Sequence, residues 1–248
     1  MKKFFFISVS TLLFSYSHAQ LKNIFKKDSS GKSGLDKIVQ KLPSKGSGNL
    51  TNDEVISGLK EALEVGTQRG TDKLSAIDGF FKDAAIKILM PPEAEKVEKT
   101  LRNVGLGKQV DNAILSMNRA AEDAAKSATS IFIDAIKQMS IQDAFGILKG
   151  GDYAATNYLK EKTTASLTEA FRPVIENSLK KVDATKYWNT VFTTYNKFSS
   201  DKVNTDLPAY VTEKALSGIF YQVGQEEQKI RKDPVARTTD ILKKVFAN

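Results

Sequence analysis

The chain has 248 residues, a formal net charge of +8, a single histidine and no cysteine. The lack of cysteine excludes disulfides, thiol nucleophiles and cysteine-bound metals, so stability must come from a hydrophobic core. This length allows one large domain or two small ones.

The first 19 residues have the pattern of a secretory signal peptide. Two lysines precede a short apolar stretch at 4–14, and small residues at 17 and 19 suit cleavage before Gln20. The stretch is shorter than the roughly 20 residues that cross a bilayer, and no cysteine is present to carry a lipid anchor. We therefore expect an exported, soluble protein, periplasmic or extracellular, with no transmembrane span.

Cleavage at this position would also remove His18, the only histidine. The mature chain would then lack the usual ligands for zinc, copper and haem, and the base of a histidine triad. We expect no metal and no cofactor.

Residues 20–49 form a basic leader rich in Gly, Ser and Lys, with seven lysines against two aspartates. Within it, "LDKIVQKLP" has the apolar spacing of a short amphipathic helix that stops at Pro43. The leader is interpreted either as a spacer or as a weak contact with anionic surfaces. Because the remaining residues 50–248 are nearly neutral, we expect no nucleic-acid binding.

From residue 50 onward, apolar residues recur every three or four positions, which predicts an all-α domain. Capping signals appear at Thr51 with Glu54, at Ser140 and at Asp152, while Gly105 has the position of a C-cap. Pro173 is expected to kink or divide its helix. The predicted helical segments are 55–70, 71–90, 93–105, 111–139, 141–150, 153–182, 184–198, 208–232 and 234–246.

These segments predict one compact domain, residues 50–248, built as an array of roughly eight to ten helices. Neither a repeat of fixed period nor a break in composition divides this part of the sequence.

The stretch "SMNRAAEDAA", residues 116–125, mixes polar residues with alanines. At 100° per residue, Arg119 and Asp123 fall on a narrow polar stripe, whereas Asn118 and Glu122 fall within the wide apolar arc. We therefore expect Asn118 and Glu122 to point into the core.

Glu227 lies in the same way within an apolar stripe of the segment 208–232, with Arg231 at its edge. A buried carboxylate needs a cation, and arginine is the natural partner because it binds carboxylates bidentately. The sequence predicts a semi-buried polar cluster of Asn118, Glu122, Glu227, Arg231 and Arg237. Glu122 and Glu227 are also the candidate catalytic acids.

Two other stretches suggest sites. "KGGDYAATNYL" places a Gly-Gly turn before a helix start, where phosphate can bind, but Asp152 is expected to fill that cap. "KYWNTVFTTYNKF" has aromatic residues at helical spacing, which suit a core or a sugar-stacking surface.

Six pieces of the sequence form a recognisable set. They are "GLKEAL" at 58–63, "DGFF" at 78–81, "MNRAAEDAA" at 117–125, "GILKGGDYAATNYL" at 146–159, "YVTEKALSGIF" at 210–220 and "EEQKIRKDPVARTTDILKKVF" at 226–246. Together they resemble a known bacterial family, domain-of-unknown-function family 4197. The resemblance implies a single exported helical domain of the bacterial envelope and brings no established activity.

The sequence favours a binding module over an enzyme. Its ligand would be an apolar or lipid-like molecule or an envelope protein, since a helical domain rich in Phe and Ala can enclose an apolar cavity. One alternative is a metal-free acid/base enzyme that uses Glu122 and Glu227. The other is a structural scaffold in which the polar cluster fixes helix register.

Overall fold

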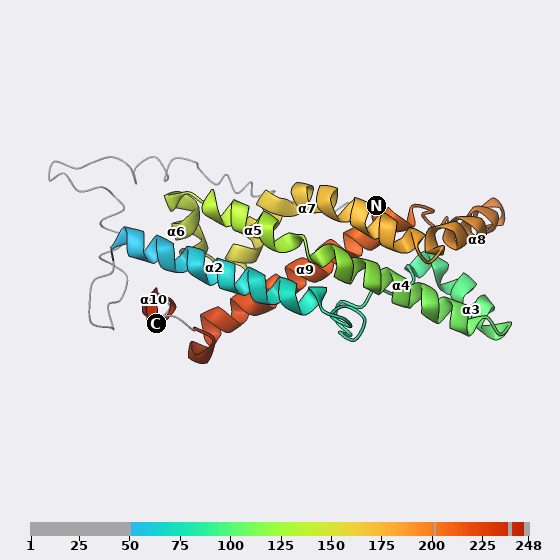
Figure 1. Ribbon diagram of the computed structural model, residues 1–248, viewed down its shortest axis with the longest axis horizontal. Coiled ribbons are helices and arrows are strands. Elements are labelled where there is room, and N and C mark those ends of the chain that lie inside the picture. Colours follow the sequence, from blue (N-terminus) through green and yellow to red (C-terminus); the bar gives the residue numbers. More distant parts are fainter. Residues whose placement is uncertain (1–50, 201, 238–239, 246–248) are drawn as a thin grey trace, which may run out of the picture. The chain divides into compact units, whose positions relative to one another are not determined.

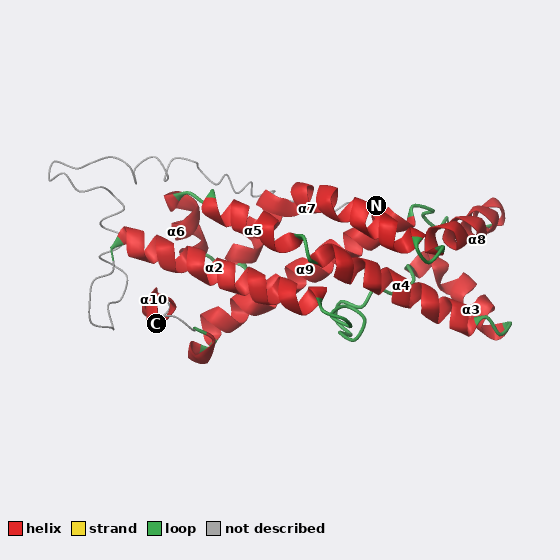
Figure 2. Cartoon of the chain, in the orientation of Figure 1, coloured by secondary structure: helices red, strands yellow, loops and turns green. Residues whose placement is uncertain are grey.

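The computed structural model describes residues 51–200, 202–237 and 240–245, and these residues form helices joined by turns (Figures 1 and 2). No strand occurs among them, so the predicted all-α class is confirmed. The predicted signal segment and basic leader lie outside the described residues. The α-helices are α2 (Asn52–Ser75), α3 (Glu95–Asn103), α4 (Gly107–Ala125), α5 (Ala128–Lys137), α6 (Ile141–Lys149), α7 (Ala154–Lys180), α8 (Ala184–Phe198), α9 (Leu207–Lys232) and α10 (Asp240–Val245), with 3-10 turns η2 (Pro92–Ala94) and η3 (Pro234–Ala236).

Several predicted helix ends are confirmed. The side chains of Thr51 and Ser140 each accept a hydrogen bond from the backbone N–H of an acid three residues later. The carboxylate of that acid in turn accepts from the backbone N–H of the Thr or Ser, which completes a capping box. Gly105 follows α3 with a φ of +86°, the left-handed conformation that favours glycine. Asp206 caps α9, which begins as expected around Pro208.

The prediction of a helix over residues 71–90 was wrong. The helix α2 runs without a break to Ser75, and residues 76–90 then form a series of turns, which we call the 76–90 segment. Phe80 is fully buried and packs on Gly218 of α9, where an added Cβ would lie 2.5 Å from its ring. The segment is therefore part of the core, although it is not helical.

The predicted helix 111–139 is divided into α4 and α5. At the break, the Ser127 hydroxyl donates to the carbonyl of Ala124 at 2.8 Å. It competes there with the backbone N–H that would bond to this carbonyl in a continuous helix. Pro173, by contrast, does not divide α7. It lies on the exposed side of the helix, where water can solvate the carbonyl that loses its partner.

The end of the chain also differs from the predicted helix 234–246. Asp233 caps the 3-10 turn η3 by accepting a hydrogen bond from the N–H of Val235, and Arg237 follows in non-helical backbone. A separate helix, α10, begins at Asp240.

The core is formed where α9 packs against α2, α4 and α7. The buried face of α4 is rich in alanine, which allows its neighbours to approach closely. Trp188 and Phe192 of α8 are buried, whereas Phe198 at its end is 88% exposed. No helix in the described ranges is both long enough and apolar enough to cross a membrane.

Candidate functional site

Glu122 on α4 binds the backbone of the 76–90 segment. Its Oε1 accepts hydrogen bonds from the N–H groups of Phe80 at 3.1 Å and Phe81 at 3.2 Å. Its Oε2 accepts from Arg119 at 2.6 Å, and the side chain is only 5% exposed. Both carboxylate oxygens of this predicted inward acid therefore have partners inside the protein.

Arg119 extends this network to Asp78. The guanidinium donates to Oδ1 of Asp78 at 2.6 Å, and Lys82 pairs with Oδ2 at 2.8 Å. Hydrogen bonds from Lys82 and Arg119 hold the pKa of Asp78 below its ordinary value. The hydrogen bonds to Glu122 and Asp78 raise the pKa of Arg119. The lowered pKa of Asp78 and the raised pKa of Arg119 both favour the charged forms of this ion pair.

Asn118 holds the same segment one turn earlier on α4. Its Oδ1 accepts from the N–H of Ile88 at 2.9 Å, and its Nδ2 donates to the Ile88 carbonyl at 2.8 Å. A second bond from Nδ2 reaches the Ile114 carbonyl at 2.7 Å. The side-chain amide is fully buried with donors and acceptor satisfied, as a stable core requires. Asn118 and Glu122 thus fix a non-helical segment against α4.

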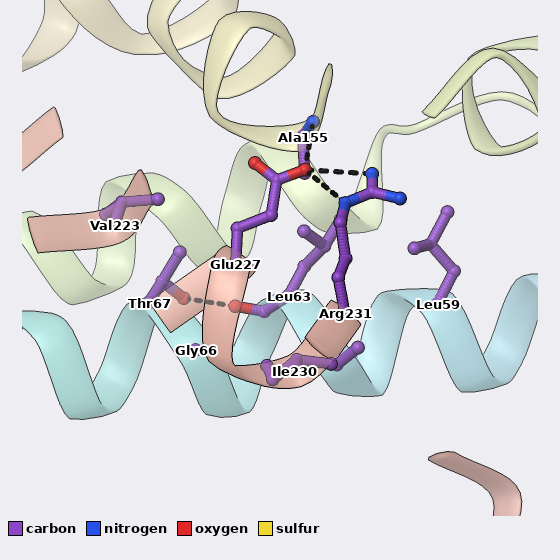
Figure 3. Close-up of a pocket in the computed structure, with 10 residues that line it drawn as sticks. Leu59, Leu63, Gly66, Thr67, Ala155, Val223, Glu227, Ile230 and Arg231 are labelled. Carbon is purple, nitrogen blue, oxygen red and sulfur yellow. Dashed lines mark hydrogen bonds and ion pairs between the residues drawn. The ribbon is translucent and has the colours of Figure 1, made fainter. Parts of the chain in front are cut away.

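Glu227 on α9 occupies the N-terminus of α7. Its Oε1 accepts from the N–H of Ala155 at 3.1 Å, and its Oε2 accepts from the N–H and hydroxyl of Thr156 at 2.8 and 2.7 Å. Arg231 donates to Oε1 from Nε at 2.8 Å and also binds the Ile147 carbonyl at 3.0 Å. Figure 3 shows the Glu227 carboxylate facing Ala155 and Arg231.

The predicted cap at Asp152 is therefore wrong. No side chain of α7's own N-terminal residues caps the helix, because Glu227 supplies the carboxylate from α9. Asp152 instead pairs with Lys232 at 3.1 Å on the surface. An anion at this helix end is already provided by the protein, which leaves no room for the phosphate considered above.

The space beside Glu227 is small. Leu63, Gly66 and Ile230 are among the residues around it, and its volume is about 30 Å³ (Figure 3). A water molecule needs roughly 10–15 Å³ by this measure, so the space suits water and is too small for a metabolite.

Arg237 lies at the end of α9 and is buried. Its Nε donates to the Ile230 carbonyl at 3.0 Å, and its Nη2 donates to the Arg231 carbonyl at 2.8 Å. These bonds satisfy carbonyls at the C-terminus of α9, where a cation is favourable.

The structure thus places the five predicted residues in two networks. Glu227 and Arg231 bind each other, with Arg237 on the adjacent backbone, whereas Asn118 and Glu122 bind the 76–90 segment. The two glutamates have no hydrogen-bond partner in common among the described residues. Nor does that part of the chain contain a group of three or more His, Cys, Asp or Glu suited to a metal ion.

A much larger pocket, of about 940 Å³, lies between α4 and α8. Its walls come from α4, the end of α7 and α8, with further residues from α3 and the start of α9. Figure 1 shows α3 and α8 at the same end of the helix array. Most lining side chains are apolar, including Val110, Met117, Trp188, Val191 and Phe192. This volume lies within the range of small-molecule sites.

The sequence did not indicate this pocket as a specific site. The signals that could have indicated it are large apolar side chains in mostly polar stretches. Leu106, Val182 and Tyr187 all line the pocket and remain 39–63% exposed. Exposed apolar residues that gather in one place typically mark a binding surface.

Polar groups gather where the end of α7 meets α4. Arg119, Asp123, Ser178 and Lys181 line the pocket there, and the Ser178 hydroxyl donates to Asp123 at 3.1 Å. A hydrogen bond from Lys126 holds the pKa of Asp123 below its ordinary value, with Ser178 adding to the effect against the opposing cost of burial.

Comparison with known proteins gives one match. A sequence model of the family described as "Protein of unknown function (DUF4197)" matches residues 49–247. No curated protein and no solved structure matches the chain significantly. The matched range includes every helix described above.

Proposed function

Because the chain belongs to the DUF4197 family, which has no assigned function, we propose from its own geometry that it binds an apolar, chain-like ligand. The ligand would lie in the pocket between α4 and α8. The pocket's volume of about 940 Å³ and its mainly apolar lining carry this proposal.

The pocket favours an elongated molecule. Residues from Gln109 to Asp123 of α4 line it, which corresponds to a length of about 21 Å at 1.5 Å per residue. Each methylene removed from water contributes ~0.8 kcal/mol, so eight methylenes would gain about 6 kcal/mol before the costs of association. An acyl or alkyl chain therefore suits this site better than a compact polar metabolite.

The bonding of Glu122 and Glu227 supports a structural role for both acids, the scaffold role considered from the sequence. Each carboxylate accepts hydrogen bonds from two backbone N–H groups and from one arginine, so both oxygens of each acid are already bonded within the protein. We therefore place function in the apolar pocket and stability in the two glutamate networks. In this proposal the protein acts as an exported binding module of the envelope, and the basic leader makes a weak contact with anionic surfaces.

Trp188 provides a direct test because it is the chain's only tryptophan and lines the pocket. We would titrate the purified protein with a brominated, uncharged C16 alcohol, whose bromine quenches indole fluorescence on contact. The expected result is saturable quenching. Absence of saturable quenching would overturn the proposal.

A pocket-filling variant assigns the quenching to this site. Ala113 lines the pocket and is half-buried, so Ala113→Phe should weaken binding roughly tenfold or more, because overpacking costs about 1–3 kcal/mol. Ala135 of α5 is half-buried but lies outside the pocket lining, so Ala135→Phe is the matched control. Equal affinities in these two variants would place the probe elsewhere and refute the proposed site.

A further inference from the structure

The charges that line the pocket are not spread along it. Arg119 and Asp123 lie towards the C-terminal end of α4, and the hydrogen bond from Ser178 to Asp123 brings the end of α7 to the same place. The other end has no charged lining residue: Leu101, Leu106 and Val110 line it together with the uncharged Gln109 and Asn112. The pocket therefore has a charged end, which we call the polar end, and an uncharged, mainly apolar end, which is the pattern of a site for an amphiphile.

Two of the three charged side chains at the polar end are already neutralised. Arg119 pairs with Glu122 and Asp78, both at 2.6 Å. Asp123 pairs with Lys126 at 2.8 Å and accepts from Ser178 with its second oxygen. Neither group needs a ligand to balance its charge.

Lys181 is the exception at this end. It is exposed, lines the pocket, and has no acidic partner within ion-pair distance among the described residues. Its neighbour Lys180 is different, because it pairs with Glu176 at 2.8 Å and does not line the pocket. Lys126 pairs with Asp123, and the charge of Lys181 also helps to lower the pKa of that carboxyl. Two lysines therefore face one carboxylate, so the polar end carries an excess of one positive charge.

We infer that the ligand is a single-chain amphiphile with an anionic head, which lies at Lys181 while its chain follows α4 towards Leu101. This inference rests on the proposed function, since it specifies the ligand of the same pocket. A carboxylate or a phosphate head suits this site, because each supplies a negative charge that can pair with Lys181.

The test compares head groups on one chain length. We would measure how brominated C16 carboxylate, alcohol and amine quench Trp188 in the whole protein, below the concentrations at which they form micelles. The expected order of affinity is carboxylate, then alcohol, then amine, with steps of about two- to fivefold for an exposed charge pair. A lysophospholipid with the same chain and an anionic phosphate head, in the same assay, shows which head binds more tightly.

Charge reversal assigns the preference to one lysine. Lys181→Glu should lower the carboxylate affinity and raise that of the amine, which reverses their order while the alcohol is unaffected. Lys186→Glu is the matched control, because Lys186 is exposed on α8 but lies outside the pocket lining. A reversal in both variants would show a general charge effect and overturn the inference.

The two proposals fail differently. If all three head groups bind equally in the pocket, the inference about the anionic head is wrong and the proposed apolar site stands. If none of them quenches Trp188 saturably, the proposed function itself is wrong.

Discussion

Glu227 of α9 accepts a hydrogen bond from the backbone N–H of Thr156 at 2.8 Å, so a residue 71 positions away in the sequence caps α7. The same carboxylate holds Arg231, whose side chain is only 16% exposed. The cap and the ion pair are therefore one unit, and removal of the acid affects both.

We expect Glu227→Gln to lower the free energy of unfolding by roughly 3–5 kcal/mol. The variant leaves Arg231 semi-buried without its anion and weakens the cap of α7. Urea denaturation measures the change, with the exposed acid in Glu161→Gln as the control. An unchanged midpoint for Glu227→Gln would argue against the structural role and return this acid to the list of candidate functional groups.

Two glycines should respond in opposite directions to alanine. A Cβ at Gly79 would lie 2.4 Å from the Lys73 carbonyl oxygen and 2.6 Å from that of Leu74, so Gly79→Ala should cost at least about 1–3 kcal/mol. Gly146 is in α6 with no heavy atom within 4 Å of such a Cβ, so Gly146→Ala should stabilise by roughly 0.5–1 kcal/mol. Thermal unfolding of both variants checks this, and a stable Gly79→Ala would mean that the 76–90 segment can shift.

Acid should weaken the cap of α6. Hydrogen bonds from Ser140 hold the pKa of Asp143 below its ordinary value in the folded protein. A lowered folded-state pKa adds stability above the unfolded pKa of about 3.9, and this stability is lost as the pH falls through the folded value. Asp143→Asn should therefore flatten the decline of the urea midpoint below about pH 4.5. If Asp143→Asn declines as steeply as the exposed-site control Asp134→Asn, the assignment to Asp143 is incorrect.

The helix α3 should exchange its amide hydrogens faster than α7 and α9. It contains no buried residue, whereas α7 and α9 bury residues along their whole length. Hydrogen exchange with mass spectrometry measures the difference. Because Leu101 of α3 lines the pocket, the C16 alcohol should slow exchange in α3. Equal protection in α3 and α9 before any ligand is added would contradict this expectation.

The native ligand, if bound with submicromolar affinity, should accompany the protein through a gentle purification. Native mass spectrometry of material taken from its own cells is expected to show an added mass in the range of a single-chain lipid. Ala113→Phe should lose this mass and Ala135→Phe should retain it. The same added mass on both variants would assign the bound molecule to another site.

The sequence predicted the elements whose signals are local. The capping boxes at Thr51 and Ser140, the C-cap at Gly105 and the inward positions of Glu122 and Glu227 all depend on residues a few positions apart. The caps follow from short motifs at a helix end, and the inward positions follow from periodicity, because a helix places such residues on one face.

The 76–90 segment could not be predicted in this way. Its apolar spacing is helical, yet its backbone N–H groups bind Asn118 and Glu122, which lie 30 to 42 positions away in the sequence. Tertiary hydrogen bonds therefore replaced the helical ones. The pocket was missed for a related reason, since Trp188 and Val191 have the same spacing whether they face a core or a cavity.

The central position of α9 has a consequence for folding. The helices α2, α4 and α7 all pack on it, although each of them precedes it in the sequence. The contacts that close the core therefore join segments far apart in the chain, and they form only after long loops have closed. Such a chain is expected to fold more slowly than a bundle in which only neighbouring helices pack together.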